Sequence, residues 1–158
     1  MRTGPASRVA PNASKTHFFN TGNERERAVR TTISKTWTFD AAHRIPHHSG
    51  KCANEHGHTY RVTVEVSGPV QPVDGRSSGG MVIDFYDLSL AWKLIEPELD
   101  HRDLNKTLEG RLEATTSELL AGYLFEHFSV KVNDLSPGIQ VTAVEVSETP
   151  SSSARVTL

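Results

Sequence analysis

The sequence predicts an α+β domain in which an antiparallel sheet is covered on one face by two helices. Three observations lead to this fold class. Two segments of alternating apolar and polar residues precede residue 68, two helical patterns lie between residues 84 and 133, and alternation returns from residue 139 to the end. The order of elements is therefore β-β-α-α-β-β, which predicts two hairpins and a four-stranded sheet.

The first two strands show a period of two residues. The apolar positions of the first are Ile33, Trp37, Phe39 and Ala41, and those of the second are Tyr60, Val62, Val64 and Val66. Residues 68–80 follow, and their prolines and glycines indicate a surface loop. We expect Met81–Ile83 to be a short extended segment.

Both helices have recognisable start signals. Asp84 can cap a helix with apolar residues Leu88, Trp92 and Ile95, which we expect to stop at Pro97. The second helix is expected to open at Thr115, because Thr115-x-x-Glu118 has the form of a capping box. Alternation over residues 139–148 and 153–158 predicts the last two strands.

The chain length of 158 residues fits one domain. Residues 1–30 contain scattered Pro, Gly, Ser and Asn with little apolar periodicity, so we expect a disordered N-terminal extension before a domain over residues 31–158. Because this extension has no acidic residue before Glu24, an organelle transit peptide is an alternative interpretation.

Composition excludes several classes of function. The extension holds six Lys or Arg against two Glu, which leaves eleven basic and seventeen acidic residues in the body of the chain. This acidic balance disfavours nucleic-acid binding, and no apolar run approaches the ~18 residues of a membrane span. Cys52 is the single cysteine, which excludes an internal disulfide and fits a reducing, cytoplasmic compartment.

Three histidines are candidate metal ligands. His56 and His58 are two residues apart on the second strand, so both side chains point to one face, with Gly57 between them. His43 has the parity of Phe39 and Ala41, and a hairpin would bring it beside the other two. Three imidazoles with an open fourth position are typical of a catalytic zinc site. His47 and His48 lie in the connecting loop and are interpreted as solvated, with substrate contact as a minor alternative.

Five ordered motifs between residues 33 and 149 resemble the 6-pyruvoyltetrahydropterin synthase family, including its bacterial 6-carboxytetrahydropterin synthase branch. The motifs are Phe39-Asp-Ala-Ala-His43, Cys52-x-x-x-His56-Gly-His58-x-Tyr60, Gly80-Met-Val-Ile-Asp84-Phe85, Leu99-Asp100-His101-x-x-Leu104-Asn105 and Glu148-Thr149. The resemblance implies the tunnelling fold, in which subunits assemble as trimers or hexamers around a barrel with active sites at their interfaces. It implies a zinc ion and the small-molecule substrate 7,8-dihydroneopterin triphosphate.

Residue roles follow from the same resemblance. His43, His56 and His58 would bind zinc, Cys52 would be the general base, Asp100 and His101 would complete a proton relay, and Glu148 would anchor the pterin, with a lesser ligand role for Thr115 and Thr116.

The chemistry of these residues agrees with the roles. A thiolate near a cation can accept a proton, a carboxylate can orient an imidazole, and a carboxylate can pair with two pterin N–H groups. Simpler interpretations also exist: Cys52 as a small buried apolar residue, Asp100-His101 as a solvated connection, and the threonines as helix caps.

The expected reaction removes a side-chain proton, eliminates triphosphate and forms 6-carboxy-5,6,7,8-tetrahydropterin with release of acetaldehyde. Three residues separate Cys52 from His56, a spacing that resembles the carboxy-forming branch. The alternatives are 6-pyruvoyltetrahydropterin formation, a zinc hydrolase or hydratase, and a non-catalytic metal- or pterin-binding module. A cupin is disfavoured because Val62 and Thr63 stand where a cupin has its Glu. Candidate triphosphate contacts are Arg44, Lys51 and Lys131.

Overall fold

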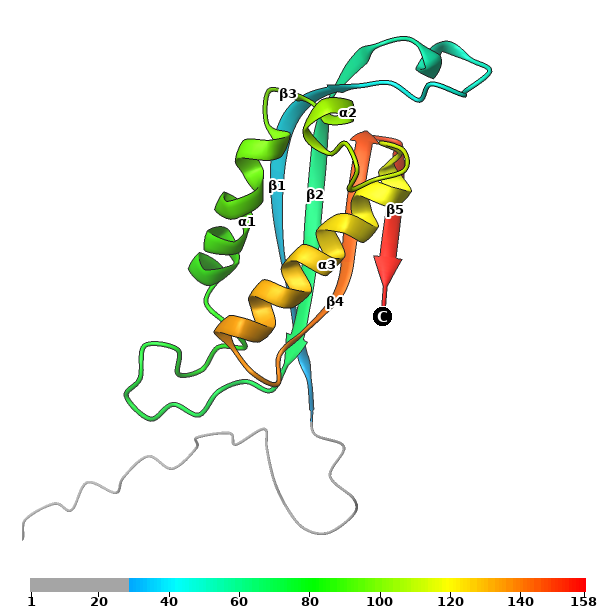
Figure 1. The fold of residues 1–158 in the computed structure, drawn as a ribbon. Helices are drawn as coiled ribbons and strands as arrows, with labels where there is room; N and C mark the ends of the chain where they lie inside the picture. The colour runs from blue at the N-terminus through cyan, green and yellow to red at the C-terminus, as the bar shows by residue number, and fades with distance from the viewer. Residues whose placement is uncertain (1–28) are drawn as a thin grey trace, which may run out of the picture.

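The structure of the protein, a computed structural model, describes residues 29–158 (Figure 1). The extension predicted for residues 1–30, with its transit-peptide alternative, lies almost wholly outside the described residues. Within residues 29–158, no helix has the length and apolar character required to cross a membrane.

One sheet of five strands forms the body of the described chain. The strands are β1 (Thr31–His43), β2 (His56–Gly68), β3 (Arg102–Asp103), β4 (Gln140–Thr149) and β5 (Ser152–Thr157). Their order across the sheet is β3-β1-β2-β4-β5, and all neighbours are antiparallel except β3 with β1, which are parallel. The prediction of four strands was therefore wrong by one, because β3 has only two polar residues and no period to detect.

All helices lie on one face of this sheet (Figure 1). They are α1 (Phe85–Leu99), the one-turn α2 (Leu104–Thr107) and α3 (Ser117–Leu135), with a 3-10 turn at Lys51–Ala53 in the loop between β1 and β2. The α+β class with helices on one face is confirmed. The segment Met81–Ile83 is not a strand; Val82 and Ile83 instead bury their side chains in the core.

Two helix ends differ from the expectation. Helix α1 continues through Pro97 to Leu99, whose side chain is fully buried, so packing in the last turn overrides the proline. Helix α3 is capped by Thr116, whose hydroxyl accepts from the N–H of Leu119, and not by Thr115. The hydroxyl of Thr115 instead points to the loop after β1, where it donates to the carbonyl of Arg44.

Alternation along the strands separates an apolar face from a polar one. Phe39, Tyr60, Val62, Val64 and Val66 are buried under the helices, and each fully buried side chain of this size contributes roughly 1.5–3 kcal/mol. The intervening residues of β1 and β2, mostly threonine and charged residues, face the other side of the sheet. The histidines continue the apolar, helix-facing row to the end of the sheet.

Candidate active site

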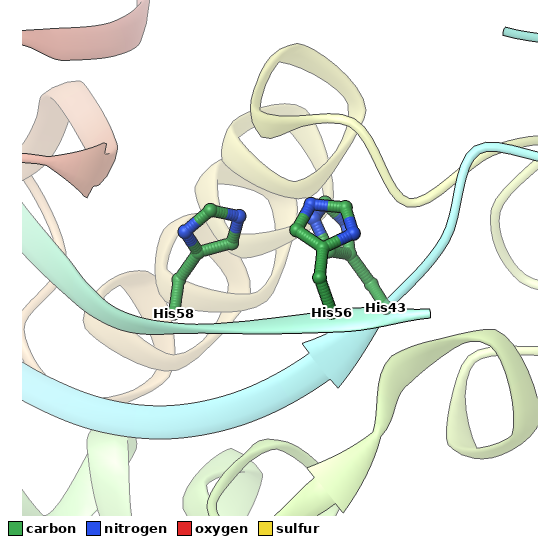
Figure 2. A group of neighbouring side chains, drawn as sticks. All are labelled: His43, His56 and His58. Carbon is green, nitrogen blue, oxygen red and sulfur yellow. The ribbon is translucent and has the colours of Figure 1, made fainter. Parts of the chain in front are cut away.

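Three histidines meet where the β1–β2 hairpin ends. The strand register pairs His43 with His56, and Ala41 with His58. Because His56 and His58 are two residues apart, both share the helix-facing side with His43. Figure 2 shows the three imidazoles on the same side of the two strands. The predicted convergence of His43, His56 and His58 is confirmed as a geometry.

The ring nitrogens of this histidine cluster fit a metal ion. One nitrogen from each ring lies within 4.8 Å of the other two. Nδ1 of His43 donates to the Thr115 carbonyl at 2.8 Å, and Nδ1 of His56 donates to the Asn54 carbonyl at 2.8 Å. A carbonyl can only accept, so both rings carry their proton on Nδ1 and present the lone pair of Nε2. The Nε2 atoms of His43 and His58 are buried, and neither has a hydrogen-bond partner among the described residues.

Electrostatics favour the neutral, ligating form of His58. Burial lowers the pKa of His58 below its usual value, the nearby carboxylate of Glu148 raises it, and the imidazoles of His43 and His56 lower it further, with burial the largest effect. A neutral imidazole near pH 7 is the form that binds a metal.

Glu148 lies beside the histidine cluster on β4. Its Oε1 is 4.0 Å from Nε2 of His43, and its side chain is partly exposed. It also lines a hollow of about 820 Å³ that His58 borders. Hydroxyl groups line much of this hollow, among them those of Thr59, Thr63, Ser147, Thr149 and Ser151. The hollow therefore combines one histidine of the cluster, the carboxylates of Glu148 and Glu145, the guanidinium of Arg61 and many neutral hydrogen-bonding groups.

Asp100 and His101 form a bonded pair at the outer side of β1. Oδ1 of Asp100 accepts from the Asp40 N–H at 3.0 Å, and Oδ2 lies 2.9 Å from Nδ1 of His101. The Asp40 N–H, followed by His101, holds the pKa of Asp100 below its usual range, so Asp100 stays a carboxylate. His101 has φ of 57°, a left-handed conformation uncommon for a residue with a side chain, and its imidazole is 76% exposed.

This pair does not lie with the histidine cluster of its own chain. A second hollow, of about 630 Å³, is lined by His101 together with Asp40, Ala42, Gly57 and Thr59; His58 borders both hollows. Those four strand residues alternate with the histidines and so belong to the sheet face away from the helices. The structure thus presents Asp100 and His101 next to the opposite face of the sheet.

Cys52 lies in the 3-10 turn of the β1–β2 loop, which projects from the end of the sheet at the top of Figure 1. Its side chain is partly buried, and its carbonyl accepts from the N–H of Ile45 at 2.7 Å. Among the described residues, Cys52 is not a member of the histidine cluster.

Four residues beside these sites have structural roles that the sequence prediction did not assign. Thr115 was assigned to substrate, but its carbonyl orients His43. The carbonyl of Asn54 orients His56 in the same way. The ring of Tyr60 meets that of His43 edge-on. The side chain of Asn105 accepts a hydrogen bond from the backbone of the loop that follows His43. Tyr60 and Asn105 belong to the quoted motifs, so their place in the motifs was the available signal.

The hydroxyl of Tyr60 is fully buried and has no partner among the described residues. Its ring stacks on Phe39 and meets His43 and His58 edge-on. Because a buried unpaired hydroxyl is destabilising, we expect Tyr60→Phe to raise the free energy of unfolding of the metal-free protein by about 1 kcal/mol. Urea unfolding measures it, with Tyr86→Phe as the exposed control. A loss of stability would show that the hydroxyl has a partner.

Comparisons with known proteins agree with this geometry. The sequence model of a family described as 6-pyruvoyl tetrahydropterin synthase matches residues 32–158. A Synechocystis protein named 6-carboxy-5,6,7,8-tetrahydropterin synthase is 41% identical over 125 residues, which cover 78% of this chain and 90% of that protein. A Drosophila melanogaster protein named 6-pyruvoyl tetrahydrobiopterin synthase is 32% identical over 132 residues, which cover 75% of this chain and 74% of that protein.

A solved structure agrees on the fold. The structure of Caenorhabditis elegans 6-pyruvoyl tetrahydropterin synthase is similar with a TM-score of 0.68 at 29% identity, covering 84% of this chain and 99% of that one.

Proposed function

The chain belongs to the 6-pyruvoyl tetrahydropterin synthase family, and on that premise we propose that it is a zinc-dependent lyase acting on 7,8-dihydroneopterin triphosphate. The products are 6-carboxy-5,6,7,8-tetrahydropterin, acetaldehyde and triphosphate, as a deazapurine pathway of the queuosine type requires. One observation carries the proposal. The three imidazoles bring one nitrogen each within 4.8 Å of one another, and one of the three, His58, borders a hollow that Glu148 also lines.

The hollow beside Glu148 is the proposed pterin site. Its volume of about 820 Å³ falls within the range of small-molecule sites. The carboxylate of Glu148 can accept two hydrogen bonds from the amino and ring N–H groups of a pterin, and such charge-assisted pairs are strong. A pterin held there would place its side chain toward His58 and the metal. Thr115 and Thr116 have a lesser role, since one orients His43 and the other caps α3.

Proton transfer is assigned to Cys52 and His101. A zinc ion bound by His43, His56 and His58 would supply Lewis acidity toward the hydroxyls of the substrate side chain. The thiolate of Cys52 takes the proton from the side-chain carbon. His101, oriented by Asp100, carries a proton to or from the same region. No nucleotide cofactor is required, because the oxidation and the reduction occur within the substrate.

The position of His101 supports a homo-oligomer. Asp100 and His101 lie beside the sheet face away from the helices and are not members of the histidine cluster of their own chain, so a second copy of the chain can bring its pair to this cluster. We therefore propose a trimer or a hexamer with active sites between subunits. The protein acts in the cytoplasm on a small molecule, without nucleic-acid or membrane partners. Residues 1–30 form an extension to a domain over residues 31–158.

We propose 6-carboxytetrahydropterin rather than 6-pyruvoyltetrahydropterin as the product because of the short link between Cys52 and His56. Ala53, Asn54 and Glu55 are the only residues between the proposed base and His56, and the short link holds Cys52 in a single turn before β2. The resemblance associates this spacing with carbon–carbon cleavage. The alternative, 6-pyruvoyltetrahydropterin formation without cleavage, is favoured by the names of the animal relatives.

We expect the zinc-loaded protein to convert dihydroneopterin triphosphate to 6-carboxytetrahydropterin and to release one acetaldehyde for each triphosphate. Mass spectrometry identifies the pterin, and a coupled dehydrogenase assay measures acetaldehyde. Formation of 6-pyruvoyltetrahydropterin without acetaldehyde would reverse the product while keeping the family chemistry. Substrate binding without any turnover would instead indicate a non-catalytic pterin-binding module.

A further inference from the structure

Asn105 has no role in the proposed chemistry, yet its side chain bonds both backbone groups of one distant residue. Its Oδ1 accepts from the N–H of Arg44 at 2.8 Å, and its Nδ2 donates to the carbonyl of Arg44 at 2.9 Å. Arg44 follows His43 directly, so it is the first residue of the loop that carries Cys52. Both hydrogen bonds therefore act on the point where this loop leaves the sheet.

The carboxamide of Asn105 takes the place of a backbone peptide group beside β1, one step beyond the point where the β1–β3 pairing ends. The parallel pairing of β1 with β3 matches Ala41 with Arg102 and Ala42 with Asp103, and then stops. After Asp103 the chain turns into α2, which removes its backbone from the edge of β1. The backbone groups of Arg44 still need partners, and a primary amide offers one acceptor and a donor, as a peptide group does.

We call the two hydrogen bonds between the Asn105 carboxamide and the Arg44 backbone the loop clamp. A short series of hydrogen bonds connects the loop clamp to Cys52, the proposed base. The residue after Arg44, Ile45, donates its N–H to the carbonyl of Cys52 at 2.7 Å. The carbonyl of Arg44 accepts a further bond from Thr115 at 3.2 Å. On the other side, Asn105 lies in α2, four residues after His101 and two residues after the segment that pairs with β1. The loop clamp thus ties the loop of Cys52 to the segment of Asp100 and His101.

We propose that Asn105 is a positioning residue for proton transfer: its carboxamide sets where the Cys52 loop leaves the sheet. The inference rests on the proposed function, in which Cys52 takes the substrate proton. Its physical basis is that a proton acceptor must lie within hydrogen-bond reach of the proton it takes, and an error of about 1 Å costs on the order of 100-fold in rate. Among the described residues, the hydrogen bonds of the Asn105 carboxamide go to the backbone of Arg44 and to none of the three imidazoles, so we expect its loss to leave the metal in place.

The test uses Asn105→Asp, which keeps an acceptor for the Arg44 N–H but replaces the donor with a carboxylate oxygen facing the Arg44 carbonyl. Asn133→Ala, on the exposed surface of α3, is the matched control. Cys52 is the only cysteine in the chain, so its alkylation rate with iodoacetamide reports on this loop alone and needs no substrate. Zinc content, kcat and KM are measured on the same zinc-loaded samples.

We expect Asn105→Asp to change the alkylation rate of Cys52 by at least about threefold and to lower kcat at least about tenfold. KM should stay within about twofold and zinc content should equal that of the wild type, because neither binding group has changed. Asn133→Ala should match the wild type in every measurement. If Asn105→Asp fails to fold, Asn105→Ser, which retains one polar group, is judged by the same criteria.

Two results would overturn the inference: an unchanged alkylation rate, or an unchanged kcat despite altered alkylation. A wild-type protein that shows no turnover leads to a different conclusion. In that case altered alkylation in Asn105→Asp supports the loop clamp, while the proposed reaction fails. The two failures are therefore distinguishable.

Discussion

Replacing His58 by alanine is expected to lower the affinity of the protein for zinc by more than about 100-fold. Removing a group that merely orients a ligand already costs 10- to 100-fold in metal affinity, and here a ligand itself is lost. His58 is the best choice among the three histidines, because its side chain is only partly buried and, unlike that of His56, is not bonded to a backbone carbonyl of the loop. His43 is buried and bonded to Thr115, so its loss would also disturb the fold.

The measurement is zinc per subunit by mass spectrometry after dialysis against a weak chelator, with a competition titration for the affinity. We expect about one zinc per subunit in the wild type and less than about a tenth in His58→Ala. His47→Ala is the matched control, because His47 is exposed in the loop between β1 and β2. Full zinc in His58→Ala would remove His58 from the site, and zinc loss in His47→Ala would point to a different ligand set.

The two-residue period of apolar residues along the long strands was sufficient to predict those strands and to identify which of their side chains face the helices. Phe39, Tyr60 and Val62 alternate along strands long enough for the pattern to be unambiguous, and all three are buried. The two-residue strand β3 has no period at all, and it forms because the chain after α1 runs along the free edge of β1. Helix ends were the other error: a buried Leu99 extends α1 past Pro97.

The metal cluster could be predicted for the same reason as the sheet. His56 and His58 share a face by parity, and pairing of the hairpin brings His43 across from His56. The groups that orient these rings could not be predicted, because they are backbone carbonyls of Thr115 and Asn54. A carbonyl has no sequence signature, and its position depends on where a distant segment packs.

The opposite placement of His101 also required the structure. The sequence indicated a proton relay at Asp100 and His101, with a solvated connection as the alternative, but it did not indicate beside which face of the sheet the pair lies. The hydrogen bonds to the backbone of Asp40 fix the pair at the edge of β1, beside residues that alternate with the histidines. The chain therefore places the histidine cluster on the helix-facing side of the sheet and His101 beside the other face.

The second large effect is expected for Cys52→Ala, which should lower kcat by about 100- to 10,000-fold while zinc and fold are retained. General acid–base groups contribute rate factors of this size, and Cys52 is not part of the histidine cluster. The exchange of the substrate side-chain proton with deuterated water isolates the step, because it requires proton removal but no product release. Loss of exchange in the variant would match the loss in kcat.

Ser49→Ala is the matched control, since Ser49 is exposed in the same loop and has no assigned role. It should exchange the proton at the wild-type rate, which shows that a change in this loop alone does not abolish the reaction. Cys52→Ala should still bind about one zinc per subunit and unfold at the wild-type urea concentration, because the thiol is only partly buried. Exchange near the wild-type rate in Cys52→Ala would assign the base to another group, and the exposed His101 would be the first to test.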